Sequence, residues 1–178
     1  YYYKNSNFAS SFSLFFRTCH MCKANPLEIL SIMENKNDRP LVSFIVTTYN
    51  LPTTLLCECL QSILSLSLSK EEREIIVVDD GSEVSPLNDL VELRDKIVYV
   101  RQRNKGLSEA RNMGLVCAQG KFIQFVDGDD YLIQAPYEHC LDIARYKDAD
   151  IILFHETEEE QPEVPFECNG PMTGSAYI

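Results

Sequence analysis

The sequence predicts an α/β fold, a mostly parallel sheet flanked by helices, and two observations carry this prediction. Short β-branched apolar runs alternate with longer segments whose apolar residues recur every three or four positions. The first pattern is typical of strands covered on both faces, and the second of helices with one apolar face. Because the two kinds of segment alternate through short links, we expect parallel strands with helices on both faces of the sheet.

The predicted elements follow one another between residues 41 and 154. The expected strands lie at residues 42–46, 75–78, 97–100, 122–126 and 151–154. The expected helices lie at residues 52–66, 85–91, 107–118 and 136–146. Pro52 and Pro86 stand where a helix can begin, and Gly120 follows the third helix, as is typical of helix ends.

The regular pattern covers the middle of the chain, which we divide into three parts. Residues 1–40 show no clear helix or strand period, and we expect a poorly ordered leader there. Met33 resembles a natural start, so residues 1–32 are not assigned to the native product. Residues 41–154 form the α/β domain, and residues 155–178 open with an acidic run and contain several Pro and Gly residues, which predicts a loop.

Composition excludes several classes of protein. The 178 residues are 45% hydrophobic and 24% charged, which is the balance of a globular domain with a core. The formal charge of −11 argues against sequence-independent binding of nucleic acid, which requires a surplus of Lys and Arg. No segment reaches the ~18 consecutive apolar residues of a membrane helix.

The cysteines favour free thiols in a reducing cytosol. Their number, seven, is odd, whereas a secreted disulfide framework more often has an even number. Cys19 and Cys22 have the CxxC spacing of a zinc or redox site, but no second pair stands at a matching distance.

Polar clusters follow three of the predicted strands. They are Thr47, Tyr49 and Asn50; Asp79 and Asp80; and Asp127, Asp129 and Asp130. The carboxyl ends of parallel strands meet at one edge of the sheet, where ligands bind in such folds. Two carboxylates ~4 Å apart repel each other by about 4 kcal/mol at an effective dielectric constant near 20. A cation or a donor-rich ligand would offset that repulsion, and Mg²⁺ and Mn²⁺ prefer carboxylate and phosphate oxygens.

Each cluster taken alone also has a purely structural explanation. Asp79 to Ser82 has the composition of a turn, and Asp127 to Asp130 that of a solvated loop. Arg111 could pair with a surface carboxylate of its own helix. Gly114 in a helix costs about 1 kcal/mol relative to Ala, which indicates close approach of another backbone.

Four motifs in this order resemble the family 2 glycosyltransferases of the GT-A fold. They are VSFIVTTYN at residues 42–50, VVDDGS at 77–82, NKGLSEARNMG at 104–114 and GKFIQFVDGDD at 120–130. The similarity extends over residues 41–154, and the ordered combination is far more specific than any single motif.

The resemblance implies a metal-assisted, inverting transfer of sugar from a nucleotide-diphosphate sugar, a UDP-sugar, to an acceptor hydroxyl. It implies that Thr47, Tyr49 and Asp80 hold the base and ribose and that Asp127 lies near the ribose. Arg111 would lie near the nucleotide and balance the carboxylates. Asp129 would bind the divalent metal, Mg²⁺ or Mn²⁺, that bridges the two phosphates of the donor.

The same resemblance also implies where the protein acts and whether its acceptor-binding half is present in this chain. It implies bacterial polysaccharide or surface-glycan biosynthesis in the cytoplasm at the inner face of the membrane, with a glycan or lipid-linked acceptor. The family's general base lies well downstream of the metal motif, in the acceptor-binding half. We therefore expect this chain to be truncated, with residues 155–178 starting an incomplete acceptor side and the base lying beyond Ile178.

Other functions stay open at this stage. A nucleotide-sugar-binding module without transfer activity fits the same residues. A phosphohydrolase of the haloacid-dehalogenase type also has Asp-x-Asp after an apolar strand, as in Asp127 and Asp129, but there the motif follows the first strand of the domain. A dinucleotide oxidoreductase is disfavoured, because no GxGxxG follows any predicted strand.

Overall fold

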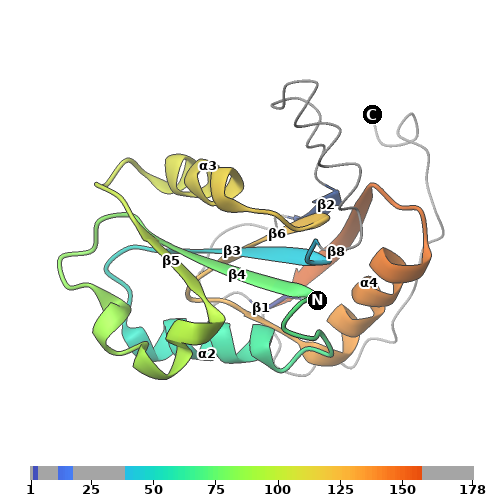
Figure 1. Ribbon diagram of the computed structural model, residues 1–178, viewed down its shortest axis with the longest axis horizontal. Helices are drawn as coiled ribbons and strands as arrows, with labels where there is room; N and C mark the ends of the chain where they lie inside the picture. The colour runs from blue at the N-terminus through green and yellow to red at the C-terminus, as the bar shows by residue number, and fades with distance from the viewer. Residues whose placement is uncertain (1, 4–11, 18–38, 158–178) are drawn as a thin grey trace.

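The computed structural model describes residues 2–3, 12–17 and 39–157, and it confirms the α/β fold. Within these residues the strands are β1 (Tyr2–Tyr3), β2 (Phe12–Arg17), β3 (Val42–Thr48), β4 (Arg73–Asp79), β5 (Val98–Arg101), β6 (Phe122–Asp127), β7 (Tyr131–Leu132) and β8 (Ile151–Thr157). The α-helices are α2 (Thr53–Leu64), α3 (Leu107–Cys117) and α4 (Gln134–Tyr146). Helix α3 covers one face of the sheet, and α2 and α4 cover the other (Figure 1).

The sheet has the order β5-β4-β3-β6-β2-β8-β1-β7. Strands β5, β4, β3 and β6 are parallel to one another, which confirms the parallel pairing expected for this part of the chain. Strand β2 is antiparallel to both of its neighbours, and β7 is antiparallel to β1.

Strand β3 lies in the middle of the core and contributes side chains to both faces of the sheet. Its seven residues are all buried. Phe44 and Val46 pack into the larger apolar cluster, which includes residues of α2 and α4, whereas Ile45 packs into the smaller cluster with Ala110 of α3. This alternation follows from the two-residue period of a strand, and it explains why the segment reads as a continuous apolar run.

Residues 85–91 were expected to form one helix, and that prediction is wrong. The structure has two short 3₁₀ helices, η2 (Pro86–Asn88) and η3 (Val91–Lys96). Leu90 and Leu93 are buried, and this spacing of three matches the three residues per turn of a 3₁₀ helix. The Asp89 N–H donates to the Pro86 carbonyl at 3.0 Å, the i+3 bond of that geometry.

Part of the expected leader is a strand. Phe12–Arg17 lies between β6 and β8, with Phe16 opposite both Ile123 and Ile151. Strands β6 and β8 are parallel to each other, and β2 lies between them. Its backbone forms hydrogen bonds with the facing edges of both strands, which would otherwise be unpaired. Of the other leader residues, the structure describes only β1 and residues 39–40. The leader prediction for the rest lies outside the described residues.

The other domain boundaries stay predictions. Strand β8 runs to Thr157, three residues beyond the predicted end of the domain, and residues 158–178 lie outside the described part. Across the ranges that are described, no helix is both long and apolar enough to cross a membrane.

Candidate nucleotide-sugar site

The polar clusters at the strand ends lie at one edge of the sheet, as their positions in the sequence predict. In the register of the sheet, Thr47 of β3 stands opposite Asp127 of β6 on one side and Val78 of β4 on the other. Thr48 is opposite Asp79. Three neighbouring parallel strands therefore deliver their terminal polar residues to the same place.

Asp127 is the residue at which strand β6, strand β3 and helix α3 meet. The Arg111 guanidinium lies 2.9 Å from Oδ1 of Asp127, and the Thr47 hydroxyl donates to the same oxygen at 3.3 Å. The Arg111 guanidinium also lies over the ring of Phe125, 5.6 Å from its centroid. Its Nε is buried and has no hydrogen-bond partner among the described residues. The site thus joins three of the residues predicted from the sequence and leaves one donor of Arg111 unused.

The Asp-Gly-Asp-Asp segment begins with Asp127, the last residue of β6, and forms a tight turn. The Gly128 N–H donates to the Thr47 carbonyl at 2.9 Å, and the Asp130 N–H to the Asp127 carbonyl at 3.0 Å. A Cβ on Gly128 would lie 2.8 Å from the Thr47 carbonyl oxygen, so this approach requires glycine. Asp130 is buried, whereas Asp129 is only partly buried and remains accessible to a ligand.

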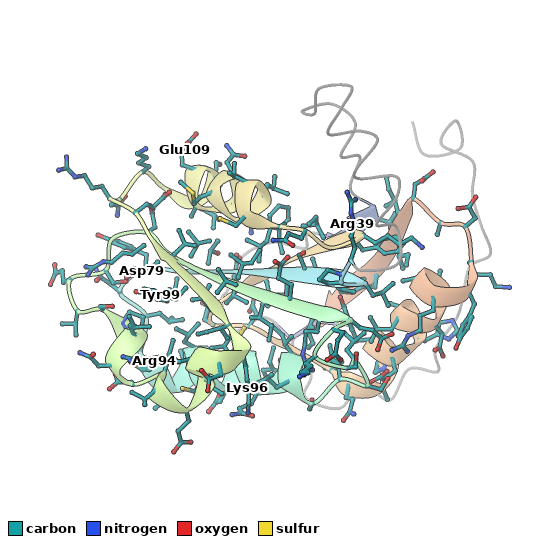
Figure 2. All side chains as sticks on the ribbon, viewed as in Figure 1. Arg39, Asp79, Arg94, Lys96, Tyr99 and Glu109 are labelled. Atoms are coloured by element: carbon teal, nitrogen blue, oxygen red, sulfur yellow. The ribbon has the colours of Figure 1, made fainter. Side chains whose placement is uncertain are left out.

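Asp79 is an internal anchor. Its side chain is fully buried and accepts a hydrogen bond from the Ser82 N–H at 2.8 Å and one from the Tyr99 hydroxyl at 2.7 Å (Figure 2). The Arg101 Nε lies 3.3 Å away. Burial alone would raise the pKa of Asp79, but the bonds from Ser82 and Tyr99 and the charge of Arg101 bring it below its usual value. Asp79 therefore stays ionised inside the fold.

Asp80 is nearly as buried, with an exposed fraction of 4%, but it faces a different loop. Its carboxylate accepts from Gln102 Nε2 at 2.7 Å, the Lys105 N–H at 2.9 Å and the Gly106 N–H at 2.8 Å. Burial opposes ionisation, yet these donors hold the pKa of Asp80 below its usual value. The carboxylate is therefore already engaged with protein donors.

The loop after β3 is tied to the loop after β4. Asn50 has a positive φ of 49°, a conformation that Asn tolerates better than most residues. Its N–H donates to the Ser82 hydroxyl at 2.9 Å, and its Oδ1 accepts from the Glu83 N–H at 2.8 Å. Tyr49, beside it, is 51% exposed and stands at the rim of the site.

The hydrogen bonds and ion pairs described above connect only some of the predicted site residues with one another. They connect Thr47, Arg111 and Asp127, and they direct Asp80 to another loop. They do not place Tyr49 or Asp129 in contact with this group. The internal role of Asp79 was not predicted, because two of its partners, Tyr99 and Arg101, lie on β5, and no motif marks them.

An open cavity of about 550 Å³ adjoins these residues. It is lined by Gly81, Arg101, Gln102, Arg103 and Asn104. Gly81 has a φ of +83°, and a Cβ there would lie 2.7 Å from the Asn104 N–H nitrogen, so only glycine allows the two loops to approach this closely.

The carboxylates fit one of the two ways in which proteins bind Mg²⁺ or Mn²⁺. Among the described residues, no three His, Cys, Asp or Glu side chains lie close enough to form a ligand cage of their own. Such ions are also bound through one or two carboxylates together with substrate phosphates. Asp129, partly exposed beside the Arg111–Asp127 pair, suits this second mode.

Comparison with known proteins gives the family. The model for Glycosyl transferase family 2 matches residues 43–164. The uncharacterized glycosyltransferase EpsJ of Bacillus subtilis is 35% identical over 144 residues, covering 75% of this chain and 40% of that protein. The minor teichoic acid biosynthesis protein GgaB of the same organism is 34% identical over 103 residues, covering 56% and 11%. The chain thus spans two fifths of EpsJ and a smaller share of GgaB.

Solved structures show the same fold. The crystal structure of S. aureus TarS 1–349 in complex with UDP-GlcNAc is 30% identical, with a TM-score of 0.50, over 58% of this chain and 31% of that chain. The mannosyltransferase PcManGT from Pyrobaculum calidifontis, in complex with GDP-Man and Mn2+, is 25% identical, with a TM-score of 0.51, over 59% and 32%. Since the family model matches well over half of its residues, the chain belongs to glycosyl transferase family 2 and has the GT-A fold of that family.

Proposed function

We propose that this chain binds the donor in a glycosyltransferase that moves sugar from a UDP-sugar to an acceptor hydroxyl. The observation that carries the proposal is the convergence of Thr47, Arg111 and Asp127 at the carboxyl ends of β3 and β6. The similarity to TarS, which was crystallised with UDP-GlcNAc, supports a UDP-sugar as the donor.

The residues at the sheet edge divide the recognition of the donor. We assign Tyr49, exposed at the rim, to the face of the base, and Thr47 and Asp127 to the ribose hydroxyls. Arg111 offsets the negative charge of Asp127 and brings a cation to the site, with its side chain 37% exposed. Asp80 is assigned, with Thr47 and Tyr49, to the base and ribose, and its carboxylate also accepts hydrogen bonds from the loop Gln102–Gly106.

Asp129 is the residue that we assign to a divalent metal, and the Mn2+ in the PcManGT complex supports this. Such an ion, when bound, supplies Lewis-acid stabilisation of the departing diphosphate. Asp129 would anchor it from the turn after β6, while Arg111 keeps Asp127 engaged on the protein side. For an inverting transfer, an acidic general base must also take the proton of the acceptor hydroxyl. We place that base outside the described residues.

We further propose a role in bacterial surface-glycan synthesis, with a glycan or lipid-linked acceptor. The similarity to a minor teichoic acid biosynthesis protein supports this setting. The four described cysteines are free thiols, which supports a reducing compartment and hence the cytoplasmic side of the membrane.

Calorimetric titration with UDP, with and without Mn²⁺, tests the donor site. We expect Mn²⁺ to strengthen UDP binding, and Asp129→Ala to remove most of this strengthening, because the ion is held by Asp129 and the diphosphate together. Asp95→Ala, an exposed acid on η3, is the matched control and should leave both affinities unchanged. Equal UDP affinity with and without Mn²⁺, or an unaltered metal effect in Asp129→Ala, would refute the metal assignment.

A further inference from the structure

We propose that Ser62 of helix α2 is a positioning residue, which holds the acidic turn Asp127–Asp130 and so sets the place of Asp129. The metal role of Asp129 belongs to the proposed function, and the purpose of this arrangement rests on it. The hydrogen bonds of Ser62 do not, because they join only atoms of the protein. Helix α2 carries none of the residues that the resemblance assigns to the site.

The hydroxyl of Ser62 joins helix α2 to the chain that follows the acidic turn. It accepts a hydrogen bond from the Leu132 N–H at 3.0 Å and donates one to the Cys59 carbonyl of its own helix at 2.7 Å. The bond to Cys59 fixes the direction of the hydroxyl hydrogen, which leaves the lone pairs of the oxygen for Leu132. Ser62 is therefore an oriented acceptor for one backbone N–H of β7.

Helix α2 also contacts the beginning of the acidic turn. The buried Cys59 thiol lies 3.7 Å from the carbonyl oxygen of Asp127. The Leu56 side chain packs against Gly128, where an added Cβ would lie 3.4 Å from Cδ1 of Leu56. The helix therefore contacts the chain on both sides of Asp129.

The place of Asp129 depends on how the chain around it is held. Its own side chain is partly exposed, so packing constrains it little. Leu132, three residues later, belongs to the same apolar cluster as Leu60 and Ile63 of α2. Apolar packing has no direction, whereas the hydrogen bond to Ser62 fixes where the backbone stands along the helix. Metal-binding side chains must be held within about 0.5 Å of their productive geometry, so loss of this bond should weaken the metal site first.

UDP titrations over a series of Mn²⁺ concentrations test the positioning role. In Ser62→Ala the Leu132 N–H loses its acceptor, while helix α2 is kept, because alanine favours helix more than serine does. We expect the Mn²⁺ concentration that half-maximally strengthens UDP binding to rise about tenfold, an effect typical of losing a residue that orients a metal ligand. UDP affinity without Mn²⁺ should stay the same. Ser62→Thr keeps the hydroxyl and should keep the wild-type midpoint.

Ser65→Ala is the matched control, the same substitution at the end of the same helix. The Ser65 hydroxyl donates to the Ser62 carbonyl at 2.7 Å, a bond that does not reach the acidic turn. This variant should leave the Mn²⁺ midpoint unchanged. An unchanged midpoint in Ser62→Ala, or the same shift in both variants, overturns the proposal. A loss of UDP affinity that is equal with and without Mn²⁺ also overturns it, because Ser62 would then support the fold in general.

Amide hydrogen exchange of the ligand-free protein separates this inference from the proposed function. In Ser62→Ala, protection of the Leu132 amide should fall by about fivefold, the size of one lost hydrogen bond. Protection of the Asp130 amide, which donates to the Asp127 carbonyl within the turn, should fall with it. Unchanged protection of the Asp130 amide means that the turn is held without Ser62 and overturns the proposal. If Mn²⁺ has no effect on UDP binding by the wild-type protein, the metal assignment fails, while the exchange measurement still decides whether Ser62 holds the turn.

Discussion

Arg111 and Asp127 form an ion pair between a helix and a strand, and the pair is only partly shielded from water. The exposed fractions of the two side chains are 37% and 30%. A pair with this exposure contributes little to the free energy of unfolding, since solvent screens it and ordering two side chains costs entropy. Its importance lies in the charge of the site, because Arg111 is the cation that the structure places against the acidic turn after β6.

Arg111→Lys should therefore affect binding far more than stability. Lysine keeps the charge but lacks the planar guanidinium, which can pair with Asp127 through one N–H group and offer other N–H groups to a ligand. We expect the free energy of unfolding to change by less than about 1 kcal/mol. The UDP affinity should fall about tenfold, the size of one lost hydrogen bond to a charged group. Urea denaturation and calorimetry give the two values.

Arg145→Lys is the control for this substitution. Arg145 lies on α4 and pairs with Glu72, so its replacement should leave UDP binding as it is. A fall in UDP affinity of the same size in both variants would mean that the loss in Arg111→Lys does not come from the site.

The sequence predicted which residues gather at the sheet edge better than it predicted what each of them contacts. Thr47 and Asp127 follow strands that turned out to be neighbours, so their meeting follows from the order of the sheet. The partners of Asp79 and Asp80 depend on the register of β5 and on the path of the loop after it. Tyr99 and Gln102 have no motif of their own, which is why the internal role of both carboxylates was not predicted.

Helix α3 lies unusually close to strand β3, and Gly114 is the reason. A Cβ built on Gly114 would lie 2.2 Å from Cγ2 of Ile45, far inside van der Waals contact. A glycine within a helix predicted close approach of another backbone here, and the structure places the Ile45 side chain of β3 there instead. The close packing brings the helix, and with it Arg111, against the strand that ends at Thr47.

Gly114→Ala should destabilise the protein although alanine favours helix. Alanine gains up to about 1 kcal/mol in helix propensity. The added methyl group must displace Ile45 or move the whole helix, and overpacking of a core typically costs about 1–3 kcal/mol. We expect a net loss of stability in urea denaturation, with a lower UDP affinity because the helix carries Arg111.

A double-mutant cycle with Ile45→Ala checks the cause. If the clash with Ile45 is responsible, Gly114→Ala should cost less in the Ile45→Ala background than in the wild type, since the two sites are in contact. Equal costs in both backgrounds, or a stabilised Gly114→Ala, would count against close packing as the explanation.

At the level of elements, the sequence predicted those with a strong period and missed those that depend on partners. Strands β3, β4, β6 and the helices α2, α3 and α4 have the expected places within a few residues. Strand β7 has two residues, too few to show a period. Strand β2 was not predicted because its position is defined by β6 and β8, which are distant in the chain, and not by a pattern of its own.

The whole molecule is acidic, with 27 Asp and Glu residues against 16 Lys and Arg. Two buried carboxylates, Asp79 and Asp80, are nevertheless stabilised by local hydrogen bonds, and Asp79 also by Arg101, so that their pKa values are lowered. In the core, burial raises the pKa of the Cys59 thiol and of the Tyr137 hydroxyl, which keeps both groups neutral. The structure therefore favours ionised carboxylates at the carboxyl ends of the strands, and a neutral thiol and phenol in the apolar core.

These opposite shifts predict a stability plateau with two flanks. A carboxyl with a lowered pKa in the folded state contributes stability above its unfolded pKa, about 3.9, and this contribution is lost as the pH falls through the folded value. A thiol or phenol with a raised pKa contributes stability below its unfolded pKa, about 8.5 or 10, and this is lost as the pH rises further. We expect the free energy of unfolding to be nearly constant between about pH 5 and pH 8 and to fall on both sides.

Urea denaturation in about 0.15 M salt, which screens the net charge, measures the free energy of unfolding at each pH. Asp79→Asn should flatten the acidic flank and Cys59→Ala the alkaline one, and a stability that increases from pH 5 to pH 3 would contradict the role of the buried carboxylates.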